Sequence, residues 1–189
     1  MKKSLITTSL LLIFAIPLVT IAQTEIGLNG VGARIGYIMP EGDIENTLGF
    51  GLNADIGTFN ESIKLFAYLD YWGKGYDLGY WEWNWSVINI AAIGKYPIEM
   101  QGSLKPYVGG GLGLSFNHWS SDYKGPASPY VSENDLESSA TDTELAIHLL
   151  GGADMELTPQ MDGFAEIKYT ISGNADYFGL FVGINYKLK

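Results

Sequence analysis

The stretch KPYVGGGLGLSF, residues 105–116, alternates between two kinds of side chain. One face carries Val108, Gly110, Leu112, Leu114 and Phe116, and the other carries Tyr107, Gly109, Gly111, Gly113 and Ser115. A period of two residues is typical of a β-strand, whose successive side chains point to opposite faces. Glycine weakens an ordinary strand, because it has no side chain to pack and loses the most backbone entropy. The stretch therefore predicts a strand with one apolar face and one unusually small face.

Seven further segments alternate in the same way. They span residues 30–39, 47–58, 62–72, 84–96, 143–157, 163–171 and 177–188. Each of the eight is long enough for a tilted strand to cross a bilayer. The connectors after the second, fourth and sixth segments are tight, whereas residues 73–82 and 117–142 form long connectors rich in polar or aromatic residues. Short turns at one rim and longer loops at the other are typical of an outer-membrane barrel.

The fold class that this pattern predicts is all-β: a transmembrane antiparallel up-and-down β-barrel of eight strands. Lipid offers no hydrogen bonds, so a sheet that crosses it must pair every strand edge by closing on itself. The apolar faces then contact acyl chains, and the small or polar faces line a bore just wide enough for side chains. Glycines at 109, 111 and 113 would make room there for bulky inward groups. A bulge or sharp corner at 109–111 is the alternative.

The first 22 residues, MKKSLITTSLLLIFAIPLVTIA, have the pattern of a secretory signal peptide rather than of a membrane anchor. Two lysines precede a short apolar run, and the small residues Thr20 and Ala22 precede a cleavage site before Gln23. We therefore predict cleavage, which leaves residues 23–189 as one barrel domain in the outer membrane of a Gram-negative cell. The chain has no cysteine, which excludes disulfides and lipid attachment at a cysteine.

The charge balance excludes one class of partner. The chain has 21 acidic residues against 11 basic ones, and its formal net charge is −10. Such a surface does not attract nucleic acid. The segments expected outside the membrane, residues 40–47 and 117–142, are acidic, so they form either a solvated surface or a loose bridge through divalent cations. The sequence offers no cofactor motif, and we expect no cofactor.

Three stretches resemble a known family. They are KPYVGGGLGLSF, GFAEIKYT at 163–170 and YFGLFVGINYKLK at 177–189, and they are similar to the outer-membrane β-barrel domain family of small porin-like, OmpA/OmpX-type barrels. The resemblance implies a monomeric barrel whose partners are outer-membrane lipids and, during biogenesis, the barrel-assembly machinery. The family often ends on an aromatic residue, whereas this chain ends Tyr186-Lys187-Leu188-Lys189, so Tyr186 would serve that role.

The inward faces of the predicted strands carry charges of both signs. They include Arg34, Asp55, Lys64, Asp70, Lys95, His148, Asp154, Glu156, Glu166 and Lys168. Charges in a narrow interior must pair and be hydrogen-bonded, because desolvating them alone is very costly. We predict a polar network that plugs most of the bore. A narrow ion pathway is the alternative, although wide aqueous pores need about 16 strands.

The stretch WGKGYDLGYWEWNW, residues 72–85, is the densest aromatic region. It contains Trp72, Tyr76, Tyr80, Trp81, Trp83 and Trp85. Such residues form girdles where an outer-membrane barrel meets the lipid–water interface. We predict a girdle at the outer interface, with a surface for a ligand, such as a sugar of the cell envelope, or a partner as the alternative. Tyr96, Tyr107, Phe164 and Tyr186 would form the opposite girdle.

One set of residues could carry catalysis. His118 and Ser120 continue the outward face of the opening stretch, and Glu133 or Glu137 follows them in the chain. This pattern is similar to a lipid A 3-O-deacylase, in which a histidine would activate serine as the nucleophile and a carboxylate would orient the histidine. Ser121-Asp122 departs from the asparagine usual in that family. We therefore expect no enzyme, and these residues stay weak candidates.

The function that the sequence predicts is an integral outer-membrane barrel with a structural or surface-interaction role. A lipid-modifying enzyme of the deacylase type is one alternative. A soluble periplasmic barrel with a ligand cavity is another, but the outward faces carry almost no charge, which water would not favour.

Overall fold

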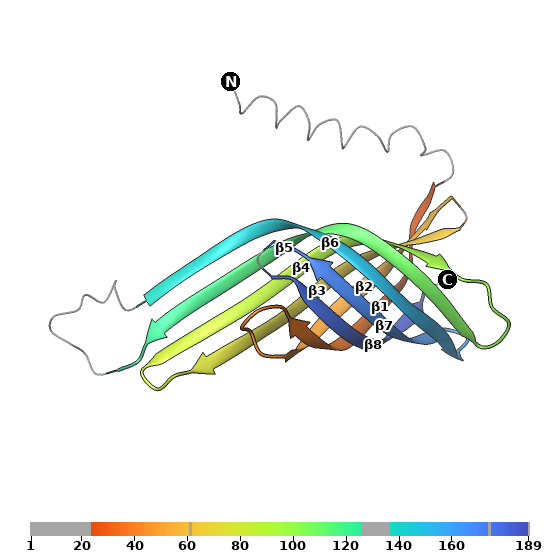
Figure 1. Cartoon of the computed structure of the whole chain (residues 1–189). Coiled ribbons are helices and arrows are strands. Elements are labelled where there is room, and N and C mark those ends of the chain that lie inside the picture. The colour runs from red at the N-terminus through yellow and green to blue at the C-terminus, as the bar shows by residue number, and fades with distance from the viewer. Residues whose placement is uncertain (1–23, 61, 126–136, 174, 189) are drawn as a thin grey trace, which may run out of the picture.

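Eight strands make up a closed barrel in the computed structural model, which describes residues 24–60, 62–125, 137–173 and 175–188. They are β1 (Thr24–Pro40), β2 (Thr47–Phe59), β3 (Ile63–Asp77), β4 (Trp81–Pro97), β5 (Leu104–Tyr123), β6 (Glu137–Thr158), β7 (Met161–Ile171) and β8 (Tyr177–Lys187). Each strand pairs antiparallel with the next, and β8 returns to pair with β1 (Figure 1). The predicted fold class is confirmed. The signal-peptide prediction, residues 1–22, lies outside the described residues.

The barrel body turns its apolar face outward. Leu52, Ile90, Leu114, Ile147 and Val182 are each more than two-fifths exposed, and each comes from a different strand. Their neighbours in sequence point inward and are mostly small, polar or aromatic. No helix among the described residues is long and apolar enough to cross a membrane.

The glycine stretch lies in the middle of β5, with its small face inward. The β4–β5 ladder runs without a shift from the Pro97–Tyr107 pair to the Trp81–Tyr123 pair, so the alternative of a bulge at 109–111 is wrong. A Cβ at Gly111 would lie 2.0 Å from the Ala92 carbonyl oxygen and 2.8 Å from Cδ1 of Ile93. The glycines therefore let neighbouring backbone and inward side chains approach closely.

Strands β3 to β6 reach farther than the other strands, as Figure 1 shows. β2 pairs with β3 only as far as Trp72, and β7 pairs with β6 only from Ile147. Beyond these points β3–β6 continue as a four-stranded sheet made of residues 73–77, 81–87, 117–123 and 137–142. We call this part the projecting sheet.

The expectation that residues 73–82 and 117–142 are loops was therefore wrong for residues 73–77, 81–82, 117–123 and 137–142, which lie in strands. The reason is that strand pairing continues after the apolar outward pattern has ended, and the pattern was the only sequence signal for the strand. We call the end of the barrel that bears the projecting sheet the loop rim. The opposite end, with its short connectors at 98–103 and 159–160, is the turn rim.

Candidate functional site

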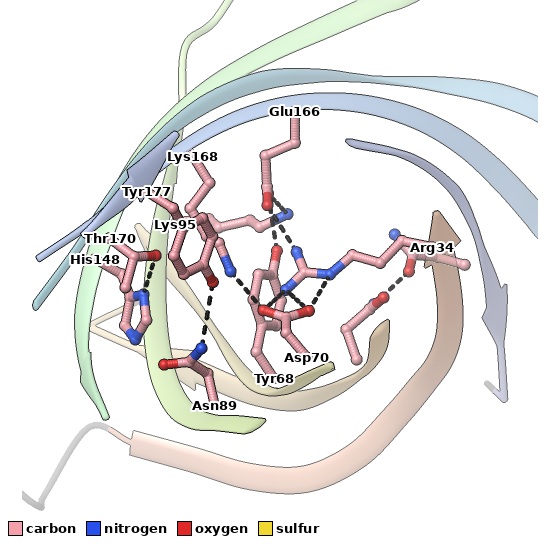
Figure 2. A network of polar contacts seen from close by, with 12 residues as sticks. Arg34, Tyr68, Asp70, Asn89, Lys95, His148, Glu166, Lys168, Thr170 and Tyr177 are labelled. Atoms are coloured by element: carbon pink, nitrogen blue, oxygen red, sulfur yellow. Dashed lines mark hydrogen bonds and ion pairs between the residues drawn. The ribbon is translucent and has the colours of Figure 1, made fainter. Parts of the chain in front are cut away.

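A layer of ion pairs crosses the bore at its middle (Figure 2). Asp70 on β3 and Glu166 on β7 supply the carboxylates, and the cations are Arg34 on β1, Lys95 on β4 and Lys168 on β7. All five side chains are at most 4% exposed. The layer thus joins β1, β3, β4 and β7 across the bore through buried, charge-assisted hydrogen bonds, which are the strong kind.

Arg34 holds the two carboxylates together. Its Nε donates to Oδ1 of Asp70 at 2.9 Å, its Nη2 to Oδ2 of Asp70 at 2.6 Å, and its Nη1 to Oε1 of Glu166 at 2.8 Å. The Nζ of Lys168 also donates to Oδ2 of Asp70. The Arg34 guanidinium carbon lies 3.7 Å from the ring centroid of Tyr68, in cation–π geometry.

Glu166 is the most connected carboxylate. Its Oε2 accepts hydrogen bonds from the hydroxyls of Tyr68 at 2.8 Å and Tyr107 at 3.0 Å. The same oxygen lies 3.0 Å from Nζ of Lys95, which in turn lies 4.0 Å from the ring centroid of Tyr107. Sequence reasoning assigned Tyr107 and Phe164 to a girdle at the turn rim, but both are buried inside, at 4% and 6% exposure.

Apolar clusters lie on either side of the charged layer. Toward the loop rim are Ile38, Trp72, Val87, Ala175, Tyr177 and Phe181. Toward the turn rim are Phe66, Tyr68, Ala91, Ile93, Tyr107 and Leu150. Glycine makes room for the first cluster, since a Cβ at Gly36 would lie 2.4 Å from the Phe181 ring.

Trp72 and Trp85 depart from the predicted girdle. Trp72 is 1% exposed, and its ring centroid lies 5.6 Å from that of Tyr177 in an edge arrangement inside the barrel. Trp85 is half-buried and packs against the same cluster. Trp72 lies two residues after the inward-facing Asp70, and Trp85 lies two residues before the inward-facing Val87. The alternation of each strand therefore predicts that both tryptophans point inward.

The other polar residues predicted for the interior are dispersed. His148 is buried, and its Nδ1 lies 3.0 Å from Oγ1 of Thr170. Asp55 and Asp154 are half-buried and, with the exposed Lys64, line a cavity of about 70 Å³ at the turn rim. Lys64 lies there because it is only the second residue of β3. Glu156 is exposed at the same rim. The predicted polar network did not include Asn89, Ser115 or Asn117, which are also buried on the inward faces of β4 and β5.

The projecting sheet reverses the polarity of the barrel body. Its outward face carries Asn84, Ser86, His118, Ser120, Ser139 and Thr141, whereas its inward face carries Tyr76, Trp81, Trp83, Trp85, Trp119 and Tyr123. The change occurs just above Ile88, Phe116 and Leu145, the last apolar outward residues of β4, β5 and β6. We therefore expect lipid to surround the barrel up to that level, because only apolar side chains are stable against acyl chains.

The remaining residues of the predicted outer girdle lie on the projecting sheet or at its tip. Trp83 is 50% exposed, Trp81 is 39% exposed, and the Trp81 ring centroid lies 5.1 Å from that of Tyr123. Tyr76 is half-buried, and its hydroxyl accepts a hydrogen bond from the Glu45 backbone N–H at 2.6 Å. Tyr80, 61% exposed, lies in the β3–β4 turn. Sequence reasoning missed Trp119 and Tyr123, which lay in a segment expected to be a loop.

The structure places His118 and Ser120 on the polar outward face of the projecting sheet. Nδ1 of His118 lies 2.9 Å from Oγ1 of Thr141, and no hydrogen bond joins His118 to Ser120 in the described part of the chain. The third candidate, Glu133, and the side chain of Glu137 lie outside the described residues. A nucleophilic serine needs a base within hydrogen-bond reach, and the histidine is turned to β6 instead.

The loop rim is acidic. The two lysines described at this rim are in ion pairs: Nζ of Lys74 lies 2.7 Å from Oε2 of Glu45, and Nζ of Lys124 lies 2.5 Å from Oε2 of Glu82. The hydrogen bond to Glu82 raises the pKa of Lys124. The described residues contain no group of three or more His, Asp or Glu side chains that could hold a metal ion.

Comparison with known families settles the class of protein. A family model described as outer membrane protein beta-barrel domain matches residues 8–187. The chain belongs to this family. It is therefore an outer-membrane protein, and the alternative of a soluble periplasmic barrel is set aside. No curated protein sequence matches it.

Solved structures of outer-membrane proteins share its fold. Neisserial surface protein A is 20% identical with a TM-score of 0.59, and the match covers 84% of this chain and 96% of that one. Ail of Yersinia pestis is 16% identical with a TM-score of 0.58, covering 85% and 97%. A second Ail structure, in complex with the heparin analogue sucrose octasulfate, has 15% identity, a TM-score of 0.54 and coverage of 85% and 97%. At these identities the likeness supports the fold alone.

Proposed function

We propose that this outer-membrane barrel of a Gram-negative cell is a surface-interaction protein with a closed bore and no catalytic activity. The observation that carries the proposal is the projecting sheet, which raises an aromatic inward face beyond the level at which lipid surrounds the barrel. A barrel with only a structural role would gain nothing from such a face, since exposed aromatic rings in water are costly unless they meet a partner. The loop rim then faces the outside of the cell.

Closure of the bore is supported by the layers described above. An ion crossing the barrel would have to pass two apolar clusters and disrupt the ion pairs of Asp70 and Glu166. Breaking a buried, hydrogen-bonded charge pair costs about 3–5 kcal/mol. This cost, together with the width of an eight-stranded bore, favours a plugged interior over an ion pathway.

Binding of a sulfated sugar, as in the Ail complex, is not part of the proposal. Among the residues that the structure describes, the acidic ones at the loop rim are Glu41, Asp43, Glu45, Asp77, Glu82, Asp122, Asp142, Glu144 and Asp176. A polyanion would be repelled by them, since only Lys74 and Lys124 oppose them among the described residues of this rim, and both are already paired. A hydrolase is not proposed either, because His118 bonds to Thr141 rather than to Ser120.

A variant without the projecting sheet tests the proposal. Gly73 pairs with Ser86, and His118 pairs with Thr141, so each hairpin can be closed there with an Asn-Gly turn. We expect the shortened protein to keep its heat-dependent migration on SDS gels and an intact envelope, while cells bearing it attach less well to protein-coated surfaces than wild-type cells. Purified wild-type protein should show no steady current in planar bilayers. Unchanged attachment would contradict the surface role, and steady single-channel currents would contradict closure.

A further inference from the structure

The inward face of the projecting sheet is an ordered array of aromatic rings. One row across the strands reads Lys74, Trp85, Trp119 and Ala140, and the next reads Tyr76, Trp83, Ser121 and Ser138. Trp81 and Tyr123 pair in the row beyond. Adjacent strands lie about 4.8 Å apart, so each row is on the order of 14 Å wide. The array is thus large enough for several side chains of a partner.

Considering the described residues alone, the array is open on the β6 side. Ala140 and Ser138 are the neighbours of Trp119 and Ser121 on β6, and their small side chains do not cover the rings. β7 pairs with β6 only from Ile147 onward, so the next strand ends below Ala140 in the described part of the chain. Trp83, in the centre, is 50% exposed. A ligand can therefore approach Trp119 and Trp83 over β6.

An exposed carboxylate lies on the β6 side of the array. Asp142 is exposed on the inward face of β6, opposite Asn117 and diagonal to Trp119. Diagonal neighbours on one face of a sheet are about 7–8 Å apart, within reach of a long side chain that contacts both. A cationic group lying on the Trp119 ring would therefore have Asp142 as its counter-ion.

The chain already binds one of its own cations in this way. Nζ of Lys74 lies 5.7 Å from the Tyr76 ring centroid and 2.7 Å from Oε2 of Glu45. That lysine thus has a ring on one side and a carboxylate on the other, at the β3 edge of the same array. The β6 side of the array, around Trp119 and Asp142, has a ring and a carboxylate but no basic residue among those described.

We propose that the array binds an arginine- or lysine-rich polypeptide segment, whose cationic groups lie on the Trp119 and Trp83 rings and pair with Asp142. Cation–π contacts favour tryptophan, and the net acidity of the loop rim attracts a basic partner and repels an acidic one. A polypeptide fits better than a small cation, because the rings extend over several strands. This inference rests on the proposed surface-interaction role and names its partner.

Peptide binding to the full chain tests the inference. The protein is reconstituted in phosphatidylcholine nanodiscs, and its folding is checked by the heat-dependent shift on SDS gels. The probes are a nine-residue peptide, Arg-Ser-Gly repeated three times, and the same peptide with Glu for Arg. We expect calorimetry to show binding of the arginine peptide, weakened by salt, and none of the glutamate peptide. Trp119→Leu should weaken binding between about 2-fold and about 30-fold, which corresponds to one cation–π contact.

Matched variants locate the site. Asp142→Asn should weaken binding and reduce its salt dependence, because it removes the counter-ion. Ser120→Ala, on the opposite face of the same strand, and Tyr96→Leu, an exposed aromatic residue at the turn rim, should bind like the wild type. A folded protein that binds neither peptide, or both equally, would overturn the inference, as would wild-type affinity in both Trp119→Leu and Asp142→Asn. If the shortened variant still reduces cell attachment in those cases, the surface role stands and only the partner is wrong.

Discussion

The buried ion-pair layer predicts which of its charged side chains can be replaced at the smaller cost in unfolding free energy. It contains three cations, Arg34, Lys95 and Lys168, against the carboxylates Asp70 and Glu166. Replacing Glu166 with Gln removes the only carboxylate that forms an ion pair with Lys95 among the described residues. This leaves a buried ammonium without a counter-ion, for which a loss of about 3–5 kcal/mol in unfolding free energy is expected.

Removing a cation from the layer should reduce the unfolding free energy less than removing a carboxylate. In Arg34→Met, Asp70 keeps Lys168 as its partner, and Glu166 keeps Lys95 and its hydrogen bonds from Tyr68 and Tyr107. Every remaining buried charge keeps a counter-ion, so only hydrogen bonds are lost. The expected loss in unfolding free energy is about 1–3 kcal/mol. The assay is urea unfolding in phospholipid vesicles, followed by tryptophan fluorescence, with Ser120→Ala as the control. If Arg34→Met reduces the unfolding free energy as much as Glu166→Gln or more, the reasoning from buried charges without a counter-ion is refuted.

Three further predictions concern the inward-facing glycines, the outward face of β5 and the acylation of lipid A. Gly111→Ala should cost about 1–3 kcal/mol in the same unfolding assay, because its Cβ would lie 2.0 Å from the Ala92 carbonyl oxygen, whereas Gly151→Ala, with its nearest contact at 3.8 Å, should cost nothing. Leu112→Lys, nearer the middle of the lipid-facing band, should lose about 2–4 kcal/mol, but Ser120→Lys on the same face of β5 should stay within about 0.5 kcal/mol; equal losses would contradict the change of polarity between them. Mass spectrometry of lipid A should show the same acylation in cells with wild-type protein and with Ser120→Ala, and a difference would restore the deacylase hypothesis.

The sequence predicts the body of the barrel well, because lipid imposes a strict alternation on it. Leu112 and Leu114 face outward as their period of two requires, and each of the eight predicted segments lies within or largely within one strand. The ends of β3 to β6 could not be predicted in the same way. Above Phe116 the solvent on the outward face is water, so residues such as His118 and Ser120 look like loop residues although they remain paired in the sheet.

The interior was predictable in composition but not in its pairing. Alternation places Arg34, Asp70 and Glu166 on inward faces, yet Arg34 and Glu166 are 132 residues apart in the chain. Which inward residues meet depends on the stagger of the strands around the barrel, and sequence alone does not give that stagger. Lys64 and Asp154 share the inward parity but lie at the turn rim, which explains why they line a separate cavity.

The central claim is that β5 passes from lipid to water between Leu114 and His118 while its strand continues. Because the chain has no cysteine, single cysteines can be introduced at Leu112, Leu114, His118 and Ser120 without background. Their labelling by a membrane-impermeant maleimide in intact cells measures contact with outside water directly. The account predicts rapid labelling at positions 118 and 120 and protection at 112 and 114. Equal labelling at all four positions, or protection at 118 and 120, would contradict it.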